Sequence, residues 1–448
     1  MRKALWALLA SIAMLHATPE EDAAFASVAG KIDAVPQSLD LAQAEELAAA
    51  HHPRVAAAEA RAAAAGQQVC EARSAFFPQV SADALAVGVD NDASQNAAAG
   101  TLGASTMETR QSDGLNATQL VTDFGRTASL TSQARHLAGA QRADAVAARA
   151  GVLRDADQAY FAVLEAQAIL RVAEETVQSR NLVLARVAAL EEAKLKSNLD
   201  VSFARVDLGN ADLLRLQARS RVDEAFAALA AALGYGGDGT SRIFRLADVQ
   251  PYPAPEDDVA PLLKRAFRNR PEIAAAIQQA EAARRFAAAR RAEQYPVIQA
   301  VGAVGVSPVR DGALDAHYAA AGVNLSLPLL TGGKLSAQVD EADARTAEQE
   351  RLVDELRNDV ARDVRTAWLR SAAAYRKIEV SEDLAANAAQ SLDLAQARYT
   401  SGLSSIVELS RAQLNKTQAE IATVSARYDY QILAAELKYQ LGEFQKNP

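Results

Sequence analysis

The stretch HPRVAAAEARAAAAGQQVCEARSAFFPQV at residues 52–80 returns in altered form as RPEIAAAIQQAEAARRFAAARRAEQYPVI at residues 270–298. Pro53 and Pro78 of the first copy correspond in register to Pro271 and Pro296 of the second, without a gap between them. Several matches in one fixed register indicate an internal duplication, and a duplicated plan sets the architecture of a chain. The sequence therefore predicts two structural repeats.

The duplication continues beyond this stretch. Upstream, Asp40 and Asp258 are separated by the same number of residues as Pro53 and Pro271. The later matches are separated by a slightly smaller number of residues, which is constant among them. Those later matches are Gly125 with Gly333, Ala159-Tyr160-Phe161 with Ala367-Trp368-Leu369, and Leu233-Gly234 with Leu441-Gly442. We expect the difference between these two separations to lie in one loop. The expected divisions are a signal peptide at 1–17, a first repeat at 38–234, a linker at 235–257, a second repeat at 258–442 and a tail at 443–448.

Prolines mark the expected helices. In each quoted copy the first proline suits the first turn of a helix, and the second proline ends that helix. No proline then occurs between Pro78 and Pro251, or between Pro328 and the last residue, so two very long helical tracts are allowed. A helix from Thr127 to about Lys196 would extend about 105 Å at 1.5 Å per residue.

Apolar side chains follow one side of these tracts at steps of three and four residues. In the second repeat they are Val353, Leu356, Val360, Val364 and Ala367. Such a stripe is buried only against other helices, so we expect an antiparallel coiled-coil bundle. The expected turns lie near Lys196-Ser197-Asn198 and Ser401-Gly402, and the returning helices are expected to end at Gly234 and Gly442.

Between the helix pairs the apolar period changes to two, as in AGVNLSLPL at residues 321–329. Val323, Leu325 and Leu327 share one face, which we expect to face lipid, and polar or small residues share the other. The expected strands span about 79–89, 115–124, 297–306 and 319–329. Strands of about ten residues are long enough to cross a bilayer when tilted. Four strands cannot close a barrel and open edges are not tolerated in lipid, so several copies must pool their strands.

The N-terminus has the features of a secretory signal, with Arg2 and Lys3 before an apolar run from Ala4 to about Leu15. No later segment has the roughly 20 uncharged apolar residues of a membrane-spanning helix. The formal net charge of −9 disfavours nucleic acid as a partner. The only cysteine, Cys70, lies in a helical pattern, where we expect a buried apolar role.

Motifs that would indicate nucleotide binding, metal binding or catalysis are weak in this sequence. The glycine-rich run from Gly234 to Gly239 follows a helix instead of a strand, so we interpret it as a helix cap and linker. His51-His52 has no metal-ligand partner at useful spacing and is explained by a helix end before Pro53. No nucleophile, base and orienting group can be assembled, so we expect no enzyme activity, no cofactor and no metal.

Several short motifs resemble those of the TolC-like outer membrane efflux proteins, and the resemblance covers about residues 38–443. The motifs are Asn269-Arg270-Pro271 with its counterpart at Pro53, Phe77-Pro78, Asp123-Phe124-Gly125-Arg126, Leu330-Thr331-Gly332-Gly333, Ala397-Arg398-Tyr399 leading to Gly402, and the closing Leu-Gly pairs. In this interpretation Gly125, Gly332 and Gly333 lie at the joins between strands and helices.

The resemblance implies an α+β membrane protein, a homotrimer in which four strands per protomer form one twelve-stranded transmembrane β-barrel. A coiled-coil helical barrel continues it into the periplasm of a Gram-negative bacterium. It also implies an exit duct in the outer membrane that docks on a periplasmic adaptor and an inner-membrane transporter. Drugs, metal ions and secreted proteins all remain open as cargo.

Family members carry a constriction at the periplasmic tip, where acidic side chains form a selectivity ring. Glu408 matches the first acidic position, but the second is Arg411 here. We expect Arg411 to pair with Glu408 in the preceding helical turn or with a neighbouring protomer. Tyr399 matches a gating tyrosine, with simple packing as the alternative interpretation.

The resemblance also marks the tip as the surface that adaptors contact. The contact candidates are Thr400, Ser401, Gly402 and Leu403 in the second repeat and Lys196, Ser197 and Asn198 in the first. Lys194 stands where a glycine would be expected, so adaptor pairing is expected to differ between the repeats. The competing hypothesis is a non-conducting coiled-coil scaffold, which gives no reason for four strand-like segments placed between the helix pairs.

Overall fold

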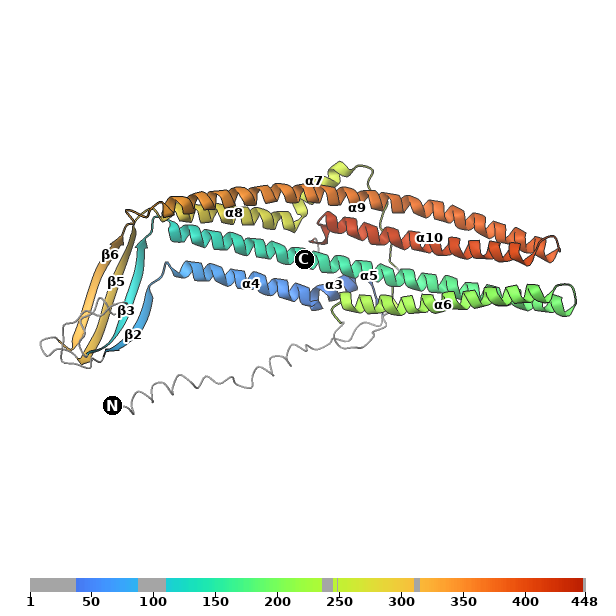
Figure 1. The fold of residues 1–448 in the computed structure, drawn as a ribbon, viewed down its shortest axis with the longest axis horizontal. Coiled ribbons are helices and arrows are strands. Elements are labelled where there is room, and N and C mark those ends of the chain that lie inside the picture. Colours follow the sequence, from blue (N-terminus) through green and yellow to red (C-terminus); the bar gives the residue numbers. More distant parts are fainter. Residues whose placement is uncertain (1–37, 88–109, 236–244, 248, 310–314, 446–448) are drawn as a thin grey trace, which may run out of the picture.

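The computed structural model describes residues 38–87, 110–235, 245–247, 249–309 and 315–445. The expected signal peptide at 1–17, the end of the predicted first strand and most of the loop after it lie outside the described residues, as do most of the glycine-rich run and residues 446–448. The described chain is long and narrow, with a β-sheet at one end and two helical hairpins at the other (Figure 1).

The helices come in pairs of equal length, one from each repeat. They are α3 (Leu41–His51) and α7 (Val259–Asn269) with 11 residues, α4 (Pro53–Ser74) and α8 (Pro271–Ala292) with 22, α5 (Arg126–Glu192) and α9 (Lys334–Thr400) with 67, and α6 (Asn198–Ala232) and α10 (Ile406–Gln440) with 35. The four lengths recur in the same order along the two halves of the chain, which is the pattern that a duplication produces. A helix of 67 residues extends about 100 Å.

Local signals start and end these helices where the sequence predicts. Pro53 and Pro271 are each the first residue of their helix, where the missing N–H of proline costs nothing. Gly234 and Gly442 follow α6 and α10 with positive φ of 86° and 69°, the left-handed backbone that glycine adopts without strain.

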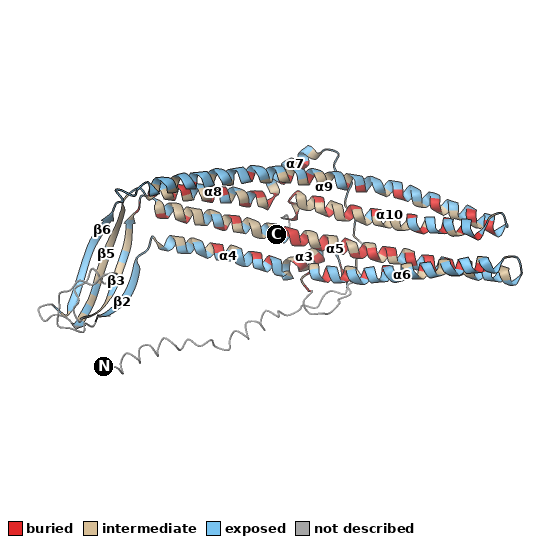
Figure 2. Ribbon diagram, viewed as in Figure 1, coloured by how far each residue is buried: buried red, intermediate tan, exposed pale blue. Residues whose placement is uncertain are grey.

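Helix α5 is the centre of the helical part, since it contacts α3, α4, α6, α8 and α10. Many of its buried side chains are alanine or valine, which allow close approach of neighbouring helices. Buried positions gather where helices meet, whereas much of α9 and the sheet is exposed in the single chain (Figure 2). Cys70 is exposed on α4, so the prediction of a buried cysteine was wrong. None of the described helices is both long and apolar enough to cross a membrane.

The four-stranded sheet is antiparallel, in the order β2-β3-β5-β6. Its strands are β2 (Gln79–Val87), β3 (Arg110–Thr122), β5 (Val297–Val309) and β6 (His317–Ser326). Pairing of β3 with β5 joins the two repeats, which leaves β2 and β6 as the edges.

The predicted strand ends need correction. Strand β3 starts at Arg110 instead of residue 115 and ends at Thr122 instead of residue 124, because Asp123 already accepts a hydrogen bond from the Thr127 backbone N–H in the first turn of α5. Strand β6 ends at Ser326, not at residue 329, since its last partner is the first residue of β5 and Pro328 has no N–H to donate. Leu327, predicted as the third lipid-facing residue of this strand, therefore lies just beyond it.

A second, unpredicted sheet lies at the middle of the molecule. Two-residue strands β1 (Ser38–Leu39) and β4 (Arg245–Leu246) pair in parallel. The buried Tyr160 donates its hydroxyl to the carbonyl oxygens of Leu39 and Ala247, at 2.9 and 2.7 Å. This tyrosine on α5 therefore ties the start of the described chain to the inter-repeat linker.

Glycines in the sheet make room for one aromatic ring. Tyr318 on β6 pairs with Gly305 on β5, and the next residue across the sheet is Gly114 on β3. A Cβ atom on Gly305 would lie 2.5 Å from the Asp113 carbonyl oxygen and would clash with the Tyr318 hydroxyl. The ring thus lies over two strands in a groove that only glycine leaves open.

We expect Gly305→Ala to destabilise the sheet by about 1–3 kcal/mol, the usual cost of overpacking. Gly302→Ala is the matched control, because its Cβ would meet nothing nearer than the Ala320 carbonyl oxygen at 3.8 Å. The measurement is the thermal midpoint of the purified protein in detergent. Equal midpoints for the two variants would contradict the role given to this groove.

Candidate functional site

The candidate site lies at the helical end of the molecule, where α5 turns into α6 and α9 turns into α10 (Figure 1). Gly402 has a φ of 75°, and the residue at the equivalent position of the first repeat, Lys194, has a φ of 59°. Lysine thus adopts the left-handed backbone that glycine adopts in the second repeat, at a cost of roughly 1–2 kcal/mol. The two turns have the same backbone shape with different side chains.

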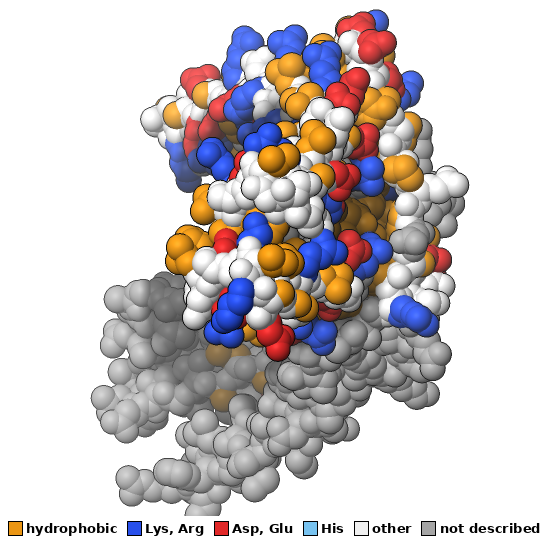
Figure 3. All heavy atoms as spheres, turned by 90° about the vertical axis from the view of Figure 1, so that its right-hand side faces the viewer, with side chains coloured by type: hydrophobic (Ala, Val, Ile, Leu, Met, Phe, Trp, Pro, Cys, Tyr) orange, Lys and Arg blue, Asp and Glu red, His pale blue; other side chains and the backbone are white. Residues whose placement is uncertain are grey.

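The remaining tip candidates surround these turns. Ser197 caps α6 in a capping box with Asp200, and Asn198 is the first residue of the helix. Thr400 ends α9 with its hydroxyl donated to the Gln396 carbonyl oxygen at 2.7 Å. Leu403 is 73% exposed. Seen from this end, apolar, cationic and anionic side chains are interspersed (Figure 3).

Glu408 lies in the first turn of α10, and its carboxylate pairs with Arg398 of α9, Nε to Oε1, at 3.0 Å. Within the chain the ion-pair partner of Glu408 is thus the arginine across the hairpin and not Arg411, and the alternative pairing of Arg411 with a neighbouring protomer stays a prediction. All three residues line one groove of about 540 Å³ between the ends of α9 and α10. Among the described residues that line this groove Glu408 has the only carboxylate, so the lining carries a net charge of +1.

Tyr399 is 2% exposed and packs in a small apolar cluster at the tip. The cluster combines both hairpins: Val187, Val201, Ala204, Tyr399, Ile406 and Leu409. The Lys196 ammonium lies 4.0 Å from the centre of the Tyr399 ring and 3.5 Å from its carbonyl oxygen. Burial raises the pKa of the Tyr399 hydroxyl, and Asp200 adds to the effect. Tyr399 therefore joins the two hairpins in this conformation.

The strand-to-helix joins lie at the other end of the helices. Gly125, Gly332 and Gly333 have positive φ of 95°, 58° and 82°. The structure adds Phe124, with φ of 54°, as the equivalent of Gly332. Its ring stacks on Tyr295 at 5.7 Å between centroids, a contact that the sequence pattern does not signal.

Val323 and Leu325, the other predicted lipid-facing residues, lie on one face of β6 and are 72% and 60% exposed in the single chain. The opposite face of the sheet carries polar side chains. Asn116 on β3 donates its amide to Asp83 on β2 at 2.6 Å. The sheet thus has one apolar and one polar side.

A charged cluster that no sequence pattern predicts lies near the middle of the molecule. Asp157 on α5 is fully buried and accepts a hydrogen bond from Tyr252 of the linker at 3.0 Å. Lys438 on α10 lies 3.9 Å from Asp157 and 3.1 Å from Glu45 on α3. Burial, with the nearby Glu45 carboxylate, raises the pKa of Asp157 to about 8.

This cluster predicts a pH-dependent stability. The unfolded chain ionises Asp157 above about pH 4, while the folded chain holds its proton up to about pH 8. The folded state binds more protons in that window, so stability falls as the pH rises through it, by up to about 1.4 kcal/mol per pH unit.

We therefore expect Asp157→Asn to melt at a higher temperature than the wild type at pH 8.5, with little difference at pH 4. The control is Asp155→Asn on the same helix, whose carboxylate is one third exposed and pairs with Arg54 and Arg154. Thermal midpoints across this pH range are the measurement. Parallel pH curves for wild type and Asp157→Asn would contradict the prediction.

No group of three or more His, Cys, Asp or Glu side chains in the described part of the chain is arranged to hold a metal ion.

Comparison with known proteins gives consistent results. The family model described as "Outer membrane efflux protein" matches residues 45–235 and 262–443. Outer membrane protein OprJ of Pseudomonas aeruginosa is 28% identical over 71% of this chain and 67% of its own length. Outer membrane protein TolC of Escherichia coli is 24% identical over 91% of this chain and 83% of its own length. The crystal structure of the outer membrane protein VceC from Vibrio cholerae superposes with a TM-score of 0.75 at 23% identity, covering 90% of this chain and 96% of that one.

Proposed function

The chain belongs to the outer membrane efflux protein family, and from this membership we propose that three copies form an exit duct supplied by a periplasmic adaptor and an inner-membrane pump. As a member, the chain is an outer-membrane channel of Gram-negative bacteria that extends into the periplasm and serves tripartite efflux or type I secretion. Such proteins are channels and not enzymes. Membership implies a trimeric channel within an efflux complex.

The main support for three copies is the open sheet with its two unpaired edge strands. Every residue of β6 is exposed in the single chain, as are residues 79–86 of the opposite edge strand β2. In a bilayer the unpaired N–H and C=O groups of these edges would each cost several kcal/mol. Pairing β6 of one copy with β2 of the next satisfies them, and three copies of four strands give a closed barrel of twelve.

We assign the gate to the groove at the tip. Arg398, Glu408 and Arg411 form a charged lining near the point where three hairpins would converge. Tyr399 holds the two hairpins of one protomer together through its apolar cluster and through Lys196. In an open state the two hairpins of a protomer would separate at this contact.

We assign adaptor contact to the two exposed turns. The second-repeat turn is Thr400, Ser401, Gly402 and Leu403, and the first-repeat turn includes Lys196, Ser197 and Asn198. They share a backbone shape but differ in charge, which supports two adaptor contacts of unlike chemistry per protomer.

The duct is tested by recording single-channel currents of the purified mature protein in a planar lipid bilayer. Discrete openings of uniform size are expected. If neither the wild type nor a variant with both Glu408→Ser and Arg411→Ser conducts, the non-conducting scaffold becomes the better explanation.

A further inference from the structure

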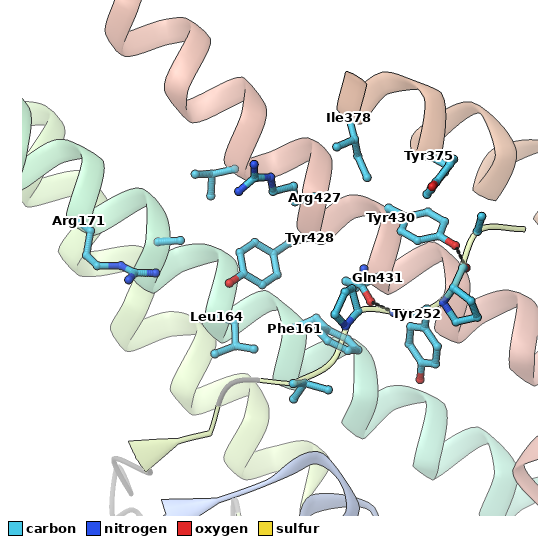
Figure 4. A pocket seen from close by; sticks show the side chains of 16 residues that line it. Phe161, Leu164, Arg171, Tyr252, Tyr375, Ile378, Arg427, Tyr428, Tyr430 and Gln431 are labelled. Atoms are coloured by element: carbon cyan, nitrogen blue, oxygen red, sulfur yellow. Dashed lines mark hydrogen bonds between the residues drawn. The ribbon is translucent and has the colours of Figure 1, made fainter. Parts of the chain in front are cut away.

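A pocket lies at the middle of the molecule, beneath the segment that links the two repeats. We call residues 249–254 the strap. The strap covers a cavity of about 730 Å³ whose other walls are α5, α9 and α10 (Figure 4). All four walls belong to one chain, so the cavity does not depend on assembly of copies.

Three hydrogen bonds hold the strap in place. The backbone N–H of Tyr252 donates to the Gln431 side-chain oxygen at 2.7 Å, and the Tyr252 hydroxyl donates to Asp157 at 3.0 Å. Tyr430 donates its hydroxyl to the Pro253 carbonyl oxygen. The pocket is therefore preformed, which lowers the entropic cost of binding.

Aromatic rings form much of the lining. Phe161 and Tyr252 lie 5.9 Å apart between ring centroids on the strap side, and Tyr375 packs edge-on against Tyr430 at 5.1 Å. Tyr428 of α10 also lines the cavity. Flat aromatic walls with a few polar groups, at this volume, are typical of small-molecule sites.

The charged side chains that line the pocket are all positive. Among the described residues the lining includes two arginines, Arg171 and Arg427, and no aspartate or glutamate. Arg427 is neutralised by Glu382 at 2.7 Å. Arg171 is exposed and forms no ion pair with any residue that the structure describes. The pocket therefore presents one uncompensated cation beside aromatic surfaces.

We propose that the pocket beneath the strap binds a small aromatic anion, with its rings against the tyrosines and its negative group at Arg171. The duct function does not require this site, and the site does not require the duct to conduct. Because the walls come from both repeats and from the strap, a bound molecule bridges the two hairpins.

Fluorescein is a suitable probe, because it is an aromatic anion whose fused three-ring xanthene is flat. Its fluorescence anisotropy is titrated with the full-length protein in lipid nanodiscs, with empty nanodiscs as background. We expect saturable binding in the micromolar range. Arg171→Glu should weaken it by about tenfold or more, since attraction becomes repulsion at close range. Tyr375→Ala should also weaken it, through loss of one aromatic wall.

Arg186→Glu is the matched control, since Arg186 is an exposed arginine on the same helix about 22 Å further along and does not line the pocket. It should leave the affinity unchanged. Rhodamine 6G shares the ring system of fluorescein but is a cation, and it should bind Arg171→Glu more tightly than the wild type. Binding of fluorescein that is equal in wild type and Arg171→Glu, or absent above background, would overturn the proposal. Unchanged single-channel currents in Arg171→Glu would show that the duct is intact.

Discussion

Replacing Gly402 with tryptophan is expected to abolish export, lowering the resistance or secretion that the channel supports by tenfold or more. Gly402 has a φ of 75°, where an L-residue with a bulky side chain is strained. Apart from its two neighbours in the chain, no described residue has an atom within 4 Å of the position of a Cβ on Gly402, so the indole ring would project outward from the tip. It would then occupy the space that we assign to the adaptor.

The assay is restoration of the phenotype of a strain that lacks the gene. Gly402→Asn is the matched variant, because asparagine tolerates the left-handed backbone and adds little bulk. It should restore export nearly fully, whereas the tryptophan variant should not. Both variants should form the same oligomer by size-exclusion chromatography, since the position packs against nothing that the structure describes. Full export by Gly402→Trp would contradict the assignment of the second-repeat turn to adaptor contact.

Much of the fold was predictable because the sequence repeats itself and because proline and glycine have strong backbone preferences. Two prolines per repeat and the glycines at 234 and 442 give the helix boundaries closely. Strand ends were less accurate, since they depend on the partner strand: β6 stops where β5 begins, which no local pattern in residues 321–329 reveals.

The candidate site was predictable only in part. Glu408 and Arg411 were found through resemblance, but the pairing of Glu408 with Arg398 depends on the approach of two helices across a turn. Local spacing favoured Arg411, one helical turn away, because spacing shows only the neighbours on one helix. Side-chain pairing between helices is decided by their relative rotation.

The buried cluster around Asp157 was missed for a different reason. Its members, Glu45, Asp157, Tyr252 and Lys438, lie on four separate elements, and each alone has the pattern of an ordinary surface residue. The packing of α3 and α10 against α5 brings Glu45 and Lys438 to Asp157, and the path of the linker adds Tyr252. The same linker path covers the pocket beneath the strap.

A channel that carries both Glu408→Ser and Arg411→Ser is expected to pass several times more current than the wild type. Serine is smaller than either residue, so the substitutions widen the groove at the tip, while the net charge of its described lining stays at +1, now carried by Arg398 alone. They also remove the carboxylate that pairs with Arg398 at 3.0 Å, so this ion pair between α9 and α10 is lost. The measurement is single-channel conductance in a planar bilayer.

Ion selectivity gives a second readout from the same recordings, as the reversal potential in a potassium chloride gradient. With two arginines and one glutamate in the groove, the wild type should favour anions weakly. Glu408→Gln should strengthen that preference, and Arg398→Ala should reduce it. Lys416→Gln with Glu420→Gln is the matched control, because this pair, 2.6 Å apart on α10, lies outside the groove. If the tip variants conduct and select as the wild type does while the control also changes nothing, then the narrowest point of the channel lies elsewhere.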